Sequence, residues 1–246
     1  MPPPALSILP PSRFFPHPEL ADDDGIVAIG GTLHPELLLD AYSHGIFPWP
    51  VDEDTPIIWA SPAKRAVFKW DKVHIPRRLK PIIRRDNFRV TINRDFVSVI
   101  RGCATAPGRR GQTWLTSAMI EAYTRFHELG FAHSVEVWQN DTLAGGVYGV
   151  AISGLFAAES MFYRVSNASK VGLLYLLAHL RQRGYALVDI QMLTPVTESL
   201  GAQEISRREY LRRLASALKL PVTFGETLAV GPEEVLALDA SANQRG

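Results

Sequence analysis

The sequence has few cysteines, no long apolar run and no signal-peptide pattern. It contains a single cysteine, Cys103, in 246 residues, which excludes an internal disulfide and a thiolate cluster for structural zinc. No apolar run approaches the roughly 20 residues that cross a bilayer, and the run at 173–180 is interrupted by His179. The N-terminus lacks the charged start and apolar core of a signal peptide. We therefore expect a reduced, cytoplasmic, globular protein without a membrane segment.

Net charge is also nearly absent, but the charges are unevenly distributed. Lys and Arg number 26 against 25 Asp and Glu, and 46% of the residues are hydrophobic, which excludes disorder as the dominant state. Residues 1–63 hold nine acidic residues and one basic residue, whereas residues 64–110 hold fourteen basic and three acidic residues. Such a basic region favours contact with a nucleic acid, although a solvated surface is the alternative. We predict a small acidic domain at 1–63 and a second domain at 64–246.

The order of the predicted elements indicates an α+β fold. Turn residues separate three alternating segments, which predicts an antiparallel meander over 134–163. A helix is expected at 168–183, between Asn167 as N-cap and Gly184, and a buried strand follows at 186–192. This order is typical of acyl-CoA N-acyltransferase (GNAT) folds, where substrate binds at the point at which the strands flanking the helix separate. Further helices are predicted at 35–44 (capped by Thr32), 76–85, 94–103, 116–129 and 206–218, and further strands at 57–59, 65–70 and 89–92.

The segment before the long helix lacks glycine. Acyl-CoA enzymes of this fold bind the pyrophosphate with the backbone amides of a glycine-rich loop, but residues 162–170 contain no glycine. An acetyl-CoA-dependent N-acetyltransferase is therefore the less favoured alternative. We expect no cofactor, and no metal because metal-ligand spacings are absent.

Three polar residues interrupt otherwise apolar predicted strands. Glu159 lies within the meander, and a period of two places Asp189 and Gln191 on the same face of the strand at 186–192. One reading is that Asp189 only anchors a backbone amide or an arginine, because a buried carboxylate needs such partners. The position beside the expected strand separation favours catalysis. Since the sequence shows no nucleophile motif, a reaction that needs neither a metal nor a covalent intermediate suits these residues, and direct attack of an amine on an activated ester is one such reaction.

Tryptophans in loops rich in proline and glycine are a further signal. Trp49, Trp59 and Trp114 lie in such loops, where an exposed indole suits stacking on a nucleic-acid base. Burial at a domain interface is the alternative, and we favour it for Trp59.

Nine segments, in unbroken order over roughly residues 14–214, resemble the leucyl/phenylalanyl-tRNA–protein transferase family. They include YSHGIFPW at 42–49, FAAESMF at 156–162 and DIQML at 189–193. The other segments are 24–31, 111–116, 127–138, 145–150, 167–170 and 199–210. A set of this length and order is far more specific than a single short motif.

The resemblance implies transfer of Leu or Phe, and less readily Met, from aminoacyl-tRNA to a protein that begins with Lys or Arg. This transfer marks the protein for degradation by the bacterial N-end rule pathway. The resemblance also implies a small N-terminal domain joined to a GNAT-like domain, and we expect a monomer.

Site residues follow from the same resemblance. Asp189 and Gln191 match the catalytic pair, in which the carboxylate orients the amide, and Glu159 matches an acid that contacts substrate amines. Trp49 and Trp114 match residues around the 3′-terminal adenosine. The apolar pocket for the transferred side chain is matched by Phe156, Met161, Leu173, Leu176 and Val188. From the basic region we expect tRNA phosphate contacts by Lys64, Arg65, Arg77, Arg78, Lys80, Arg84 and Arg85.

Two positions depart from the family pattern. Thr194 stands where the family often has Asn, and Leu176 stands where a pocket residue is often aromatic, which can shift the preference between Leu and Phe. A non-catalytic tRNA-binding module remains an alternative for the basic region and the tryptophans. This alternative does not account for the polar residues Glu159, Asp189 and Gln191 in the predicted strands.

Overall fold

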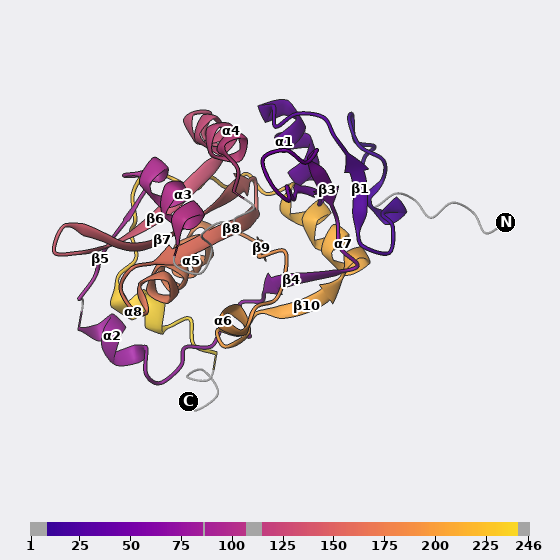
Figure 1. Cartoon of the computed structure of the whole chain (residues 1–246). Coiled ribbons are helices and arrows are strands. Elements are labelled where there is room, and N and C mark those ends of the chain that lie inside the picture. The colour runs from indigo at the N-terminus through magenta and orange to yellow at the C-terminus, as the bar shows by residue number, and fades with distance from the viewer. Residues whose placement is uncertain (1–8, 86, 107–114, 241–246) are drawn as a thin grey trace.

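The computed structural model describes residues 9–85, 87–106 and 115–240, and these residues form two β-sheets (Figure 1). A three-stranded antiparallel sheet of order β1-β3-β2 lies near the N-terminus. A seven-stranded sheet of order β10-β4-β9-β8-β7-β6-β5 forms the larger part. The strands are β1 (Ile26–Ile29), β2 (Phe47–Pro48), β3 (Ile58–Ala60), β4 (Lys64–Phe68), β5 (Arg89–Ile92), β6 (Ala132–Gln139), β7 (Thr142–Ile152), β8 (Leu155–Tyr163), β9 (Leu187–Asp189) and β10 (Gln203–Ser206).

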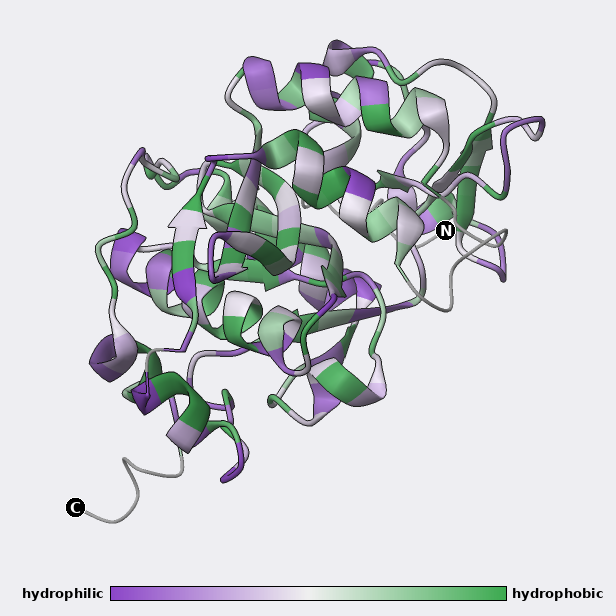
Figure 2. Cartoon of the chain, turned by 60° about the vertical axis from the view of Figure 1, so that its left-hand side comes forward, coloured by the Kyte–Doolittle hydropathy of each residue, from purple (hydrophilic) through white to green (hydrophobic). Residues whose placement is uncertain are grey.

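Helices cover both faces of the large sheet. The α-helices are α1 (Pro35–Ser43), α2 (Lys80–Arg84), α3 (Phe96–Thr105), α4 (Ser117–Glu128), α5 (Ala168–Arg183), α6 (Pro195–Glu198), α7 (Arg207–Ala217) and α8 (Pro232–Leu236), with a 3-10 helix at Pro18–Leu20. Leucines of α5 pack with Val135, Val147 and Phe156 in one buried cluster. Residues of α3 and α4 pack with Tyr148 and Ala157 in another. The strands at the centre of the sheet are correspondingly apolar in Figure 2.

The predicted α+β fold is confirmed by the strand pairing. β6, β7 and β8 form the expected antiparallel meander, and β8 pairs with β9 in parallel across α5. The boundaries of α5 and β5 coincide with the predicted helix at 168–183 and strand at 89–92. Gly184 ends α5 with a φ of 87°, a conformation that glycine adopts without steric cost.

Asn167 is the N-cap residue of α5 as predicted, but it takes a left-handed φ of 70° and its side chain makes no capping hydrogen bond. Two other local predictions are wrong. His34, not Thr32, caps α1 by accepting from the Glu36 N–H. The helix expected at 76–85 forms only at Lys80–Arg84.

The strand expected at 186–192 ends at Asp189. Gln191 has a φ of 53°, which a β-strand does not allow. The period-two argument that placed Asp189 and Gln191 on one face therefore does not apply, and their relation depends on the turn that follows β9.

Candidate functional site

The site lies where β8 and β9 separate. The two strands pair through the positions Leu155↔Leu187, Phe156↔Val188 and Ala157↔Asp189, and the pairing stops there. A hollow of about 140 Å³ opens beyond this point and is named here the apolar pocket. It is lined by Val147, Ala158, Glu159, Ser160, Met161, Leu173, Ile190, Met192, Thr194 and Thr197.

A second hollow adjoins the first and brings in the N-terminal part of the chain. This aromatic pocket has a volume of about 220 Å³ and shares Glu159, Ile190, Met192 and Thr194 with the apolar pocket. Its other lining residues are Phe47, Pro48, Trp49 and Gln191. Phe47 and Trp49 stack with ring centroids 6.1 Å apart. The two pockets together form a site with an apolar end and an aromatic mouth.

A β-bulge places Glu159 in this site. Tyr148 pairs with Ser160 and Gly149 with Ala158, so Glu159 is the extra residue of β8. Gly149 permits the close approach at the bulge, because a Cβ there would lie 2.3 Å from the Ala157 carbonyl oxygen. The bulge re-aims Glu159 toward the space between the separated strands.

The Glu159 carboxyl is surrounded by hydrogen-bonding groups. The Gln191 side-chain amide donates to it over 2.7 Å, and the hydroxyls of Tyr42 and Tyr123 hydrogen-bond to it as well. These two hydroxyls also contact one another. Burial raises the pKa of Glu159 to about 8, and the nearby charge of Asp189 acts in the same direction. The charge of Arg65 acts in the opposite direction without offsetting these causes, so the carboxyl is mainly protonated at neutral pH.

Asp189 is fully buried and its oxygens are used by the protein itself. Arg65 Nη2 donates to it over 2.7 Å, the Tyr210 hydroxyl over 2.8 Å and the Gln191 N–H over 2.8 Å. Asp189 therefore anchors both an arginine and a backbone amide, and it lines neither pocket. Its connection to the aromatic pocket is the hydrogen bond from the Gln191 N–H.

Gln191 occupies a strained turn at the end of β9. The Met192 N–H donates to the Ile190 carbonyl across it over 2.6 Å, which with the positive φ of Gln191 forms a γ-turn. Asp189 accepts from the Gln191 N–H, and the Ala66 N–H of β4 donates to the Gln191 carbonyl over 3.1 Å. This backbone support on both sides holds a conformation that is costly for a residue with a side chain.

The expectation that Arg65 contacts tRNA phosphate is wrong. Its side chain is buried, and it forms a two-pronged ion pair with Asp189. A guanidinium in this position neutralises a buried carboxylate and is closed to a nucleic acid. The charge count along the sequence does not distinguish this arginine from its exposed neighbours.

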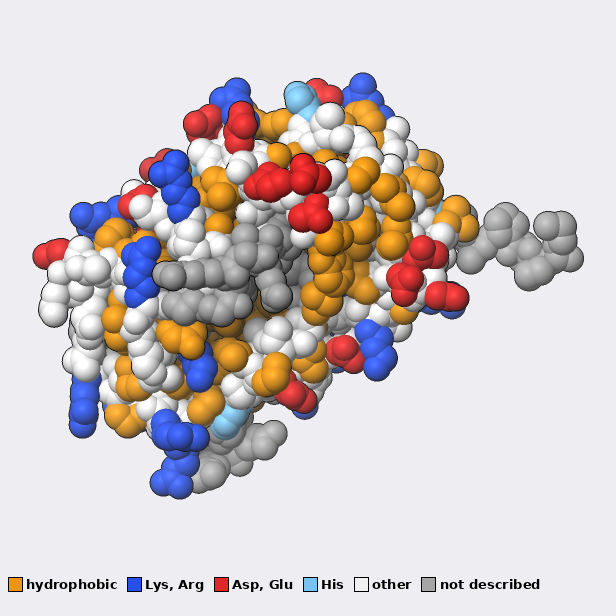
Figure 3. All heavy atoms as spheres, in the orientation of Figure 1, with side chains coloured by type: hydrophobic (Ala, Val, Ile, Leu, Met, Phe, Trp, Pro, Cys, Tyr) orange, Lys and Arg blue, Asp and Glu red, His pale blue; other side chains and the backbone are white. Residues whose placement is uncertain are grey.

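The other basic residues divide into paired and unpaired groups. Lys64 pairs with Glu204 over 3.2 Å, and Lys80 pairs with the buried Asp239 over 2.6 Å. In Figure 3, blue side chains gather at the lower left, where Figure 1 places α2. The exposed basic residues there that have no ion pair with another described residue are Arg77, Arg78, Arg84 and Arg85.

Two of the five predicted pocket residues line the apolar pocket, namely Met161 and Leu173. Phe156 and Val188 are register partners in the region where β8 and β9 still pair, so they lie in the core behind the pocket. Leu176 is likewise fully buried and lines neither pocket. Thr194 does line both pockets, and its hydroxyl also caps α6 through Thr197.

The three tryptophans have different environments. Trp49 is exposed by 36% at the aromatic pocket, whereas Trp59 is buried and donates to the Gly30 carbonyl. Burial is thus the correct reading for Trp59. Trp114 lies outside the described residues.

Sequence reasoning missed several residues around the site. Tyr42, Tyr123 and Tyr210 hydrogen-bond its carboxylates. Tyr42 and Tyr210 do fall in segments that resemble the family, but tyrosine in a helix or loop carries no chemical signal by itself. Their role depends on contacts between distant elements.

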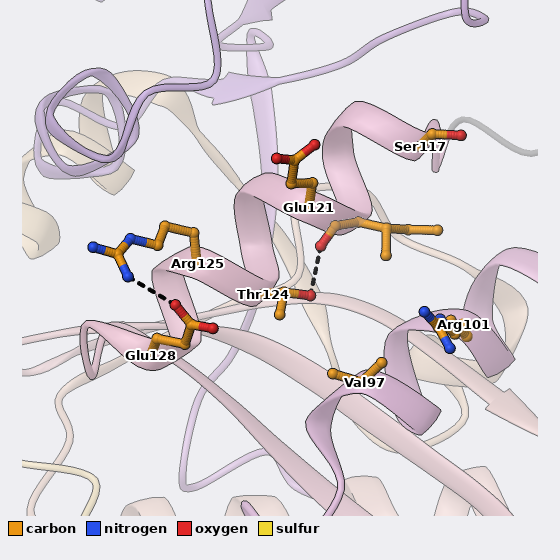
Figure 4. A pocket seen from close by; sticks show the side chains of 8 residues that line it. Val97, Arg101, Ser117, Glu121, Thr124, Arg125 and Glu128 are labelled. Carbon is orange, nitrogen blue, oxygen red and sulfur yellow. Dashed lines mark hydrogen bonds and ion pairs between the residues drawn. The ribbon is translucent and has the colours of Figure 1, made fainter.

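A larger hollow between α3 and α4, of about 640 Å³, has a different character (Figure 4). Arg125 and Glu128 on its wall pair with each other over 2.8 Å, and the Thr124 hydroxyl donates to the Ile120 carbonyl. Ser117 donates to Glu53 outside this wall. Within the described residues, no cluster of metal-ligating side chains occurs and no helix has the length and hydropathy to cross a membrane.

Comparisons with known proteins identify one family. The model of the leucyl/phenylalanyl-tRNA protein transferase family matches residues 67–215, and the model of its N-terminal domain matches residues 31–63. Leucyl/phenylalanyl-tRNA–protein transferase of Maridesulfovibrio salexigens is 48% identical over 86% of this chain and 88% of its own length. The same enzyme of Anaeromyxobacter dehalogenans is 46% identical over 91% of this chain and 97% of its own length.

Similarity to solved structures is weak. L-PGS from Bacillus licheniformis aligns with a TM-score of 0.39 and 14% identity, over 66% of this chain and 54% of that chain. A tandem GNAT protein from the clavulanic acid biosynthesis pathway aligns with a TM-score of 0.33 and 12% identity, over 73% of this chain and 62% of that chain. The family models and the sequence relatives decide the assignment: the chain belongs to the leucyl/phenylalanyl-tRNA–protein transferase family, whose members are aminoacyltransferases.

Proposed function

We propose that this protein transfers Leu or Phe, and less readily Met, from aminoacyl-tRNA to the N-terminal amine of proteins that begin with Lys or Arg. The observation that carries the proposal is the apolar pocket, which ends at the hydrogen-bonded pair of Glu159 and Gln191. An apolar side chain fits this pocket while its ester lies beside the polar pair. The modified protein then enters the bacterial N-end rule pathway in the cytoplasm.

The reaction joins the acceptor amine to the carbonyl carbon of the aminoacyl ester. The bond to the ribose oxygen breaks, the amine loses a proton and the ribose hydroxyl gains one. Because Gln191 donates its amide N–H to Glu159, its carbonyl oxygen is the group left to accept from the amine. A neutral amide is a poor base, so Gln191 positions the amine and Asp189 fixes the turn that carries Gln191.

Glu159 is suited to the proton transfer. Its pKa of about 8, raised by burial, matches the pKa of an N-terminal ammonium, which is about 8. Proton exchange between the two groups therefore costs little free energy. A cationic acceptor also favours the ionised carboxylate and is attracted by the acidic residues of the N-terminal domain.

Donor RNA is proposed to bind through two features. Arg77, Arg78, Arg84 and Arg85 offer exposed cations for backbone phosphates, and Trp49 offers an indole for the 3′-terminal adenosine. The ester arrives activated, so the reaction runs without a cofactor. We further propose that the protein acts as a monomer with a domain boundary near residue 63.

The test is incubation with leucyl-tRNA and a peptide that begins with Arg. We expect leucine at the peptide N-terminus by mass spectrometry. The same peptide beginning with Glu, or acetylated at its N-terminus, serves as the control and should remain unmodified. Absence of leucine on the Arg peptide, or equal transfer to the Glu peptide, would contradict the proposal.

A further inference from the structure

The side chain of Arg65 connects the two halves of the site. Its Nε lies 2.9 Å from Asp189 Oδ1 and its Nη2 lies 2.7 Å from Oδ2, while its Nη1 donates to the Gly45 carbonyl over 3.1 Å. Gly45 precedes β2, which supplies the wall of the aromatic pocket. One guanidinium thus binds the end of β9 and the N-terminal sheet at the same time.

Aromatic rings enclose this guanidinium on two sides. Its central carbon lies 4.6 Å from the Phe47 ring centroid and 4.4 Å from the Tyr210 ring centroid. The Tyr210 hydroxyl also donates to Asp189 Oδ2 over 2.8 Å. Planar stacking and a two-pronged contact of this kind fit arginine and do not fit lysine.

The ion pair fixes the Gln191 turn. Arg65 and Tyr210 direct Asp189, and Asp189 Oδ1 accepts from the Gln191 N–H. Without that acceptor, one of the two supports of the strained turn is lost, and the side chain of Gln191 moves relative to Glu159. A displacement of about 1 Å in a reacting group can lower a rate about 100-fold.

We propose that Arg65 and Tyr210 are positioning residues for the transfer reaction. They fix the position of Asp189, and through it that of the Gln191 turn, relative to the aromatic wall at Phe47 and Trp49. This inference rests on the proposed function. A purely structural ion pair would contribute to stability and leave the chemical step unchanged.

The variants Arg65→Lys and Tyr210→Phe separate these two readings. Arg65→Lys keeps the charge but loses the fork and the bond to Gly45, so we expect kcat to fall at least about tenfold with KM for leucyl-tRNA within about twofold. Tyr210→Phe removes one hydroxyl, and we expect a fall in kcat of about threefold to tenfold. Both are measured with leucyl-tRNA and an Arg-initiated peptide, beside each variant's thermal midpoint.

Glu136→Gln is the matched control for a buried polar group. Glu136 is fully buried on β6 and accepts from Thr91 and Ser134, away from both pockets. Its variant should lose stability with kcat unchanged. The inference would be overturned if kcat were unchanged in Tyr210→Phe. It would also be overturned if kcat fell in proportion to stability in both Arg65→Lys and Glu136→Gln.

A double variant tests the route through Asp189. If Tyr210 acts through Asp189, then Asp189→Asn combined with Tyr210→Phe is no slower than Asp189→Asn alone. If the double variant instead shows the product of the two single losses of kcat, the inference is overturned. If Arg65→Lys does not fold, the kcat of Tyr210→Phe decides the test. A wild-type protein that transfers no leucine would instead refute the proposed function, whatever the variants show.

Discussion

Glu159 shows how the environment of one side chain sets its chemistry. The residue is an ordinary glutamate in the sequence, and the bulge in β8 brings it beside two buried tyrosines and Gln191. Burial and the charge of Asp189 outweigh these hydrogen bonds and raise its pKa to about 8. Without the bulge, the side chains of one part of β8 would exchange faces of the sheet.

The raised pKa predicts a dependence of stability on pH. Glu159 keeps its proton in the folded state up to about pH 8, whereas the unfolded chain loses it near pH 4.5. The folded state therefore binds more protons in between, and stability falls with rising pH by up to about 1.4 kcal/mol per unit. Glu159→Gln stays neutral, so the thermal midpoint of this variant minus that of the wild type should increase from pH 5 to pH 8.

Glu121→Gln on the exposed side of α4 is the control for this measurement. Its midpoint should follow that of the wild type across the same range. A difference between Glu159→Gln and the wild type that stays constant with pH would show that the folded and unfolded carboxyls have the same pKa.

Gln191→Ala tests the amide itself. The variant removes the hydrogen bond to Glu159 and the proposed acceptor for the incoming amine, so we expect kcat to fall about 100-fold. Filter binding of leucyl-tRNA should change little, because the Gln191 side chain is uncharged and lies outside the proposed phosphate-binding surface. Gln139→Ala, at the end of β6, is the control and should retain the wild-type rate. Equal transfer rates in all three proteins would remove Gln191 from catalysis.

At the scale of the secondary-structure elements, the separation of β8 and β9 creates the site. Glu159, Asp189 and Gln191 could be found in the sequence, because polar residues in apolar strands need a reason. The order of meander, long helix and following strand was predictable from the hydrophobic periodicity and the turn residues. What the sequence does not show is the γ-turn at Gln191, which depends on support from Asp189 and Ala66.

Burial of individual residues was the least predictable property. Arg65 belongs to a basic stretch, yet long-range contacts with Gly45, Asp189 and Tyr210 take it into the interior. Phe156 and Val188 are apolar like the residues that line the apolar pocket, but they pair with each other one position before the last register pair of β8 and β9. A pattern along the chain gives the face of a strand, and it does not give the point at which pairing ends.

The helix α2 carries the prediction for donor binding. Arg84 and Arg85 at its end are exposed, and reversal to Glu should weaken leucyl-tRNA binding and flatten its dependence on salt. The matched control is Arg208→Glu with Arg212→Glu on α7, which Figure 1 places on the other side of the molecule. Filter binding at several salt concentrations measures the slope. Equal slopes for both double variants would make the α2 surface an ordinary solvated face.

The two sheets of the molecule share one hydrophobic cluster. Tyr42 of α1 and Trp59 of β3 belong to the same buried group as Phe96 of α3 and Tyr148 of β7, and the hydroxyls of Tyr42 and Tyr123 join α1 to α4. Because the aromatic pocket takes its wall from β2 and its floor from the β8–β9 separation, its shape depends on this shared core.

A shared core predicts a single cooperative unfolding transition. Trp59→Ala removes the largest buried side chain of the N-terminal sheet, so we expect the free energy of unfolding to fall by about 3–5 kcal/mol. Because the core is shared, this loss should destabilise the whole molecule together. In scanning calorimetry the single peak should move to lower temperature, with calorimetric and van't Hoff enthalpies that remain equal. An early, separate peak in the variant would instead mean that residues 1–63 unfold independently. The aromatic wall at Phe47 and Trp49 would then move independently of the large sheet.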